Sequence, residues 1–116
     1  MQTNTQRRVE DAQRQDGAIL AATGSTQANG ARITTSTVFV TGADGTKAVV
    51  LPPAYLGRRV LVSNEANAAL VVFPSSGDNV INGNADASYS QAAKTTIEYV
   101  ARNDSQWNIL VGAAQY

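Results

Sequence analysis

Short hydrophobic runs separated by turn residues fill the chain from Gly17 onward. Runs of about four to eight residues that are rich in Val, Ile, Thr and Tyr and bounded by Gly, Pro, Asn or Asp are typical of β-strands. No window after Gly17 sustains the period of about 3.6 residues that an amphipathic helix requires. The pattern predicts strands within residues 18–22, 34–41, 47–51, 58–63, 68–73, 88–90, 95–101 and 107–111.

Alternation within these runs predicts which side chains face the core. Val60 and Val62 share one face of their strand, as do Ile97, Tyr99 and Ala101 of a later one. Because successive strand residues point to opposite faces, Glu98 is expected to face solvent. Trp107 is expected to anchor the core, with its indole N–H bonded to a carbonyl group; a ligand-stacking role is the alternative.

Turn chemistry places the strands in one compact domain. Asn82-Gly83 is a strong tight-turn dipeptide, and residues 64–67 are expected to form a hairpin loop. The unbroken apolar run of residues 70–73 predicts a strand that is buried on both faces, either in a sandwich core or against a neighbouring subunit. Strand units spaced by roughly 8–12 residues favour a compact antiparallel β-sandwich, jelly-roll-like, over residues 18–116. No internal repeat is visible, which argues against an elongated fibre shaft.

The first 17 residues, MQTNTQRRVEDAQRQDG, differ sharply from the rest. Their only apolar residues are Met1, Val9 and Ala12, so the segment cannot bury enough surface to offset its ordering entropy. We interpret residues 1–17 as an arm that orders on a partner. A terminus without a role is the alternative.

Composition removes several classes of function. The chain has no Cys and no His, so thiolate metal sites, imidazole ligands and the commonest general base are missing. Nine basic residues balance nine acidic ones, which gives no net field for nucleic acid or an anionic membrane. The apolar runs are too short to span a bilayer, and the N-terminus lacks the apolar core of a signal peptide. We expect no cofactor.

An enzymatic role would have to rest on carboxylates. A glycan-cleaving pair is the main candidate chemistry, and the available side chains are Asp44, Glu65, Asp78, Asp86, Glu98 and Asp104. All but Glu98 fall in predicted turns, where acidic residues ordinarily serve solubility and turn geometry. The expectation is a non-enzymatic protein.

A series of short elements carries a resemblance to a known family. Leu51-Pro52, Gly57, the runs 60–64 and 69–74, Gly77 and residues 81–83 follow in order, completed by Ala85, Ala87, Ala92 and Trp107. Across residues 34–111 the chain resembles small virion proteins of tailed phages, of the head decoration or capsid-stabilising (cement) type. The resemblance implies a non-enzymatic protein on the outer surface of the phage head, with the major capsid protein as its partner. A receptor- or glycan-binding module of a tail or head fibre is the alternative.

The remaining expectations concern contacts. In the arm, Arg7, Arg8 and Arg14 are expected to pair with capsid carboxylates, and Val9 and Ala12 to add a small apolar contact. Tyr55, in a loop after two prolines, and the basic pair Arg58-Arg59 are possible interface residues. Much of the apolar content is Ala and only 6% of residues are aromatic, so the core is thin. A thin core favours a homo-oligomer, for which a trimer is the expected form.

Overall fold

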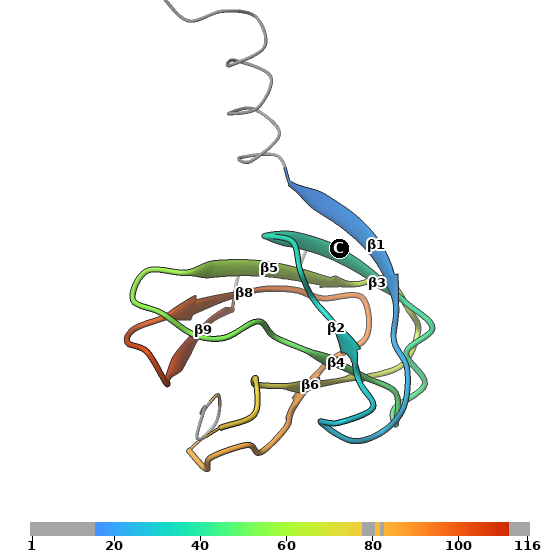
Figure 1. Ribbon diagram of the computed structural model, residues 1–116. Helices are drawn as coiled ribbons and strands as arrows, with labels where there is room; N and C mark the ends of the chain where they lie inside the picture. The colour runs from blue at the N-terminus through green and yellow to red at the C-terminus, as the bar shows by residue number, and fades with distance from the viewer. Residues whose placement is uncertain (1–15, 78–80, 82, 112–116) are drawn as a thin grey trace, which may run out of the picture.

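Two β-sheets make up the part of the protein that the computed structural model describes, which is residues 16–77, 81 and 83–111 (Figure 1). The larger sheet has the strand order β1-β3-β5-β8-β9 and the smaller one β2-β4-β6-β7. No helix among the described residues is long and apolar enough to cross a membrane. The strands span Gly17–Ala21 (β1), Ala31–Arg32 (β2), Thr37–Thr41 (β3), Ala48–Val50 (β4), Arg59–Asn64 (β5), Leu70–Phe73 (β6), Tyr89–Gln91 (β7), Thr96–Ala101 (β8) and Trp107–Val111 (β9).

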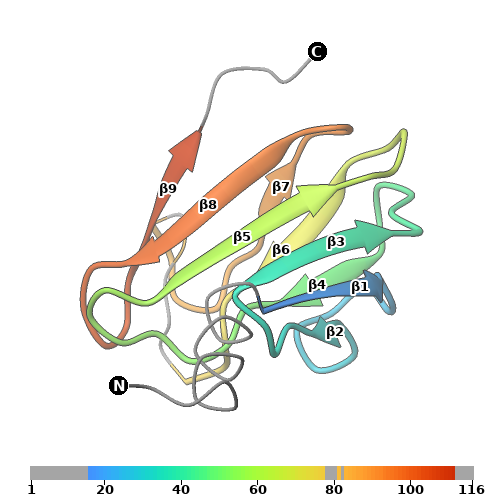
Figure 2. The same ribbon diagram turned by 90° about the horizontal axis from the view of Figure 1, so that it is seen from above.

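The first six strands alternate between the two sheets. β1, β3 and β5 pair in parallel in the larger sheet, and β2, β4 and β6 pair in parallel in the smaller one. The chain therefore winds through three stacked coils, each contributing one strand to each sheet (Figure 2). β7 then adds antiparallel to β6, and β8 and β9 complete the larger sheet in antiparallel pairing.

This winding corrects part of the sequence-based fold. An all-β domain with two sheets is confirmed, but four of the seven strand pairings in the described residues are parallel. The jelly-roll arrangement, which consists of antiparallel Greek keys, is not confirmed. Residues 64–67 do not form a hairpin, because β5 and β6 lie in different sheets. Alternation of apolar residues predicts a strand, but it does not distinguish parallel from antiparallel neighbours.

The core lies between the two sheets. Val60 and Val62 are buried, as are Ile97, Tyr99 and Ala101, so the predicted inward faces of β5 and β8 are confirmed. In β6 only Leu70 and Val72 are fully buried, whereas the alternate residues Val71 and Phe73 are half-buried, so within one chain the strand is not buried on both faces.

Trp107 is a core residue, as expected, and only 3% of it is exposed. Its indole N–H, however, has no hydrogen-bond partner among the described residues, so the expected bond to a carbonyl is wrong.

The loop between β1 and β2, residues 22–30, covers the outer face of the smaller sheet. All three residues of β4 are buried, including Ala48 and Val50, which lie outside the main core cluster. Gly30 packs against them so closely that an added Cβ would lie 2.8 Å from Val50 Cγ2. The loop is held at its far side by Gln27, whose side-chain amide donates to the Pro74 carbonyl (2.8 Å) and to Asp86 (3.2 Å).

Gln91 of β7 joins the two sheets through a buried polar network. Its amide donates to the carbonyls of Val62 (2.8 Å) and Thr95 (3.0 Å), and its Oε1 accepts from the Tyr99 hydroxyl (2.8 Å). Asn64 extends the network by donating to the Ala68 and Ala92 carbonyls. Each group is buried yet partnered, which is the condition under which a polar residue is tolerated in a core.

Burial raises the pKa of Tyr99 well above 10, with a smaller contribution from nearby Tyr89. The unfolded chain therefore loses this proton at a lower pH than the folded protein does. The stability that this pKa shift contributes is fully present below pH 10. It is expected to fall as the pH rises above the ordinary tyrosine pKa. Alkaline titration of tyrosinate absorbance should show one tyrosine that ionises only as the protein unfolds. Tyr99→Phe should remove that component; its persistence would assign the late ionisation to another tyrosine.

Candidate interface site

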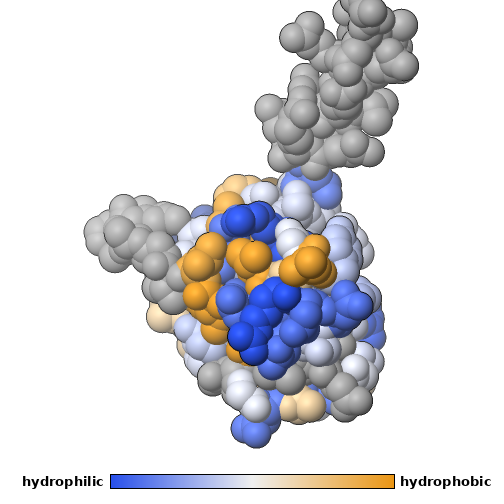
Figure 3. Space-filling model, turned by 90° about the vertical axis from the view of Figure 1, so that its left-hand side faces the viewer, coloured by the Kyte–Doolittle hydropathy of each residue, from blue (hydrophilic) through white to orange (hydrophobic). Residues whose placement is uncertain are grey.

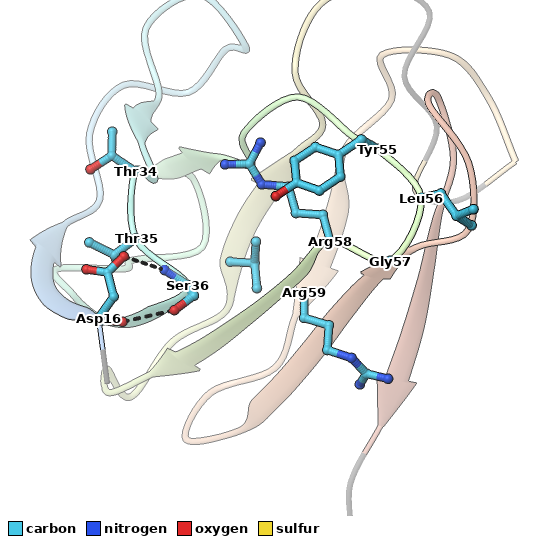
Figure 4. Close-up of a pocket in the computed structure, with 10 residues that line it drawn as sticks. Asp16, Thr34, Thr35, Ser36, Tyr55, Leu56, Gly57, Arg58 and Arg59 are labelled. Carbon is cyan, nitrogen blue, oxygen red and sulfur yellow. Dashed lines mark hydrogen bonds between the residues drawn. The ribbon is translucent and has the colours of Figure 1, made fainter. Parts of the chain in front are cut away.

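An open pocket of about 350 Å³ lies where the chain enters β1, β3 and β5 (Figure 4). Because these three strands are parallel, the residues that precede them lie at the same end of the larger sheet, where the three strands begin. The pocket is lined by residues from the starts of all three coils, namely Asp16, Thr34, Thr35, Ser36, Tyr55, Leu56, Gly57, Arg58, Arg59 and Val60.

The β4–β5 connection presents Tyr55 on the surface. Pro52 and Pro53 follow the end of β4, where their missing N–H groups interrupt no ladder. The Arg58 N–H then donates to the Tyr55 carbonyl (2.9 Å), which closes a four-residue turn. Gly57 has φ +86°, which the third position of a type II turn requires. Residues other than Gly rarely adopt this conformation. The turn leaves Tyr55 55% and Leu56 74% exposed.

Arg58 is held in place by two contacts. Its guanidinium carbon lies 4.9 Å from the centre of the Tyr55 ring, within cation–π range. Its Nη1 donates to the Pro53 carbonyl at 2.9 Å. Figure 4 shows the guanidinium extended alongside the aromatic ring, away from Leu56. An arginine whose position is already fixed loses less conformational entropy when its remaining donors bind an anion.

Arg59 belongs to the outer face of the same sheet. It forms an ion pair with Glu98 across the β5–β8 ladder (2.9 Å). The two side chains are 60% and 32% exposed, so the pair contributes at most about 1 kcal/mol to stability. Glu98 is on the outer face, as expected.

Asp16 connects the arm to the pocket. Its carbonyl accepts from the Thr37 N–H (3.1 Å) and the Ser36 hydroxyl (3.2 Å), and its carboxylate accepts from the Ser36 N–H (3.3 Å). The chain before β1 is therefore fixed to Ser36 and Thr37 at the residue where the described part begins, and Asp16 lines the same pocket as Tyr55 and Arg58 (Figure 4).

The surface around the β4–β5 connection combines opposite chemical characters. Figure 3 shows strongly hydrophilic side chains directly beside hydrophobic ones on the side where the β4–β5 and β8–β9 connections lie. The β4–β5 connection contributes an exposed aliphatic residue, Leu56, and an exposed aromatic one, Tyr55. Aromatic and arginine side chains are enriched in protein–protein interfaces.

The three interface residues named from the sequence, Tyr55, Arg58 and Arg59, all line this pocket. The arm residues Arg7, Arg8, Val9, Ala12 and Arg14 lie outside the described residues. Sequence reasoning missed Asp16, Leu56 and the segment of residues 34–36. Only the parallel stacking of coils places Asp16 and Ser36 in the same pocket as Tyr55, and no local motif signals that stacking.

The candidate catalytic carboxylates are scattered. Asp44 caps its own turn by accepting from Thr46 and Lys47, and the Thr46 hydroxyl is the main cause of its lowered pKa. Glu65 accepts from the Ser63 hydroxyl, and Asp78 lies outside the described residues. In the described ranges no group of three or more acidic side chains is placed to hold a metal ion.

Comparison with known proteins adds no assignment. No family model matches the chain, and no curated protein matches it either.

Proposed function

We propose that the protein is a non-enzymatic attachment protein of the phage head that binds the outer surface of the assembled shell and bridges neighbouring capsomers. The observation that carries the proposal is the position of Asp16: it ties the start of β1 to the pocket that holds Tyr55, Arg58 and Arg59. The described part of the chain thus begins at a residue that lines the pocket with Tyr55, Arg58 and Arg59. The resemblance to cement proteins supplies the identity of the partner, the major capsid protein.

In this mechanism Arg58 binds a carboxylate on the surface of the capsid shell. Its contacts with Tyr55 and Pro53 occupy one face of the guanidinium and one of its N–H groups. Charge-assisted hydrogen bonds from the other donors to a carboxylate are roughly twice as strong as neutral ones. Leu56, 74% exposed, would add an apolar contact beside the charged pair.

Stabilisation of the shell follows from mass action. A protein that binds the assembled lattice but not free capsid subunits shifts the equilibrium toward the lattice by RT ln(1 + [L]/Kd). An oligomer with one such surface per copy engages several capsomers at once, so modest single contacts sum by avidity. The arm residues Arg7, Arg8 and Arg14 would provide the second attachment point of each copy.

Arg58→Gln is expected to weaken binding to phage heads stripped of the protein by at least about tenfold, since one charge-assisted bond contributes roughly 1.5–3 kcal/mol. Co-sedimentation of purified protein with the heads measures this. Arg32→Gln is the matched control, because Arg32 is also exposed but lies in β2 of the other sheet. Equal binding by the two variants would remove Arg58 from the interface. Retention on host polysaccharide without any binding to heads would favour the fibre-module alternative.

A further inference from the structure

In the described part of the chain, the edge of the larger sheet at β1 has backbone N–H and C=O groups without a partner. Among the described residues, β1 pairs only with β3. The ladder begins with the Thr37 N–H donating to the Asp16 carbonyl and ends with the Ala22 N–H donating to the Thr41 carbonyl. Because alternate residues of a strand direct their backbone groups to opposite sides, Ala18 and Leu20 bond toward β3. The N–H and C=O groups of Gly17, Ile19 and Ala21 therefore point away from the sheet.

Proteins usually protect such an edge with charged side chains, proline, a bulge or a very short strand. β2, at the corresponding edge of the smaller sheet, is two residues long and ends in Arg32. β1 has none of these devices: its sequence is GAILA, and it runs for five residues. Ile19 is 79% exposed there, the most exposed large hydrophobic side chain in the described part. Figure 2 shows β1 as the last strand on its side of the larger sheet.

The free groups of β1 are complementary to themselves. In an antiparallel pairing centred on Ile19, Ile19 of one copy would exchange both hydrogen bonds with Ile19 of the other, and Gly17 would face Ala21. Every outward N–H and C=O of β1 finds a partner in this register. If the register shifted by one residue, the outward groups of one copy would lie opposite Ala18 and Leu20 of the other copy, whose N–H and C=O groups are already bonded to β3. The same register places the two Ile19 side chains opposite each other on the outer face, where cross-strand apolar pairs stabilise a sheet.

We propose that two copies of this chain join edge to edge through β1, about a twofold axis at Ile19, into one continuous sheet. The contact is isologous, since each copy contributes the same strand. It differs from the trimer expected from composition and gives a dimer, or a larger assembly built from such pairs. This pairing is independent of the capsid role, because it requires no partner other than a second copy.

A cysteine cross-link tests the register directly. The natural chain has no Cys, so Ile19→Cys would be its only thiol. Hydrogen-bonded antiparallel pairs have Cα atoms about 5.5 Å apart, within the range that a disulfide spans. Under mild oxidation the full-length Ile19→Cys protein should run almost entirely as a covalent dimer. Phe39→Cys is the matched control: it lies on the same face, one strand further in, and its two copies would be too far apart to bond.

Charge substitutions provide the second measurement. Ile19→Lys and Ile19→Glu should each sediment as a monomer of 12.2 kDa, because like charges would face each other across the axis. An equal mixture of the two variants should recover the dimer. Phe39→Lys should remain dimeric. A wild-type monomer, or an oligomer in which Ile19→Cys does not cross-link, would overturn the proposal; the latter result would mean that the arm or another surface occupies the edge.

Discussion

Removal of residues 2–15 is expected to weaken binding to phage heads severely while the β domain stays folded. The segment is polar and rich in arginine, so attachment through it gains both charge pairing and coupled ordering on the shell. The deletion ends before Asp16, because this residue bonds Ser36 and Thr37 and closes the first coil. Co-sedimentation with stripped heads should show a loss of at least about a hundredfold in affinity, corresponding to about 2.7 kcal/mol.

Two comparisons separate the arm's charge from its length. Replacing Arg7, Arg8 and Arg14 together by Gln keeps the chain length and should account for most of the loss. Added salt should weaken binding of the intact protein and have much less effect on this triple variant, since the Debye length falls to about 3 Å at 1 M salt. If the truncated protein coats heads as well as the intact one, attachment lies in the β domain, and the pocket around Arg58 becomes the whole interface.

Gln91→Leu is expected to lower the free energy of unfolding by about 3 kcal/mol. The change removes both amide hydrogen bonds and leaves the buried Tyr99 hydroxyl without its acceptor. An unpartnered buried polar group costs about 1–3 kcal/mol in addition to the lost bonds. Urea unfolding followed by tryptophan fluorescence measures the change, because Trp107 lies in the same core cluster as Tyr99.

The double variant Gln91→Leu/Tyr99→Phe tests the physical reason for this loss. Removing both partners of a buried hydrogen bond costs less than removing one, because no polar group is stranded. The double variant should therefore be more stable than Gln91→Leu alone, despite carrying one more substitution. If the two effects simply add, the Gln91–Tyr99 contact does not control the stability of this region.

Strand positions were predictable because burial alternates in ways that the sequence displays. Val60 and Val62, and Ile97, Tyr99 and Ala101, are spaced by two and point to the same core. The parallel stacking of β1, β3 and β5 was not predictable by the same reasoning. Gly17 pairs with Thr37 and Thr37 with Leu61, so successive coils differ in length and leave no fixed repeat in the sequence. β2 was missed because two residues are too few to show a period.

The residues of the candidate site likewise include some that the sequence predicts and others that only the fold brings together. Tyr55, Arg58 and Arg59 are neighbours in the chain, so one turn with Gly57 at its positive φ brings them together. Asp16 and Ser36 reach the pocket only because each precedes a parallel strand of the same sheet. Gln91 likewise shows no signal in the sequence, where it reads as one polar residue beside a short strand. Its importance comes from the sheet-to-sheet bonds that the fold creates.

Electron microscopy of phage heads with and without the protein tests the proposed attachment to the shell most directly. We expect additional density at regular positions over the whole outer shell when the protein is present, with each copy touching more than one capsomer. The side of the domain that bears Asp16 and Tyr55 should face the shell. Density confined to a tail or fibre, or a bare shell at saturating protein, would contradict a cement role on the head.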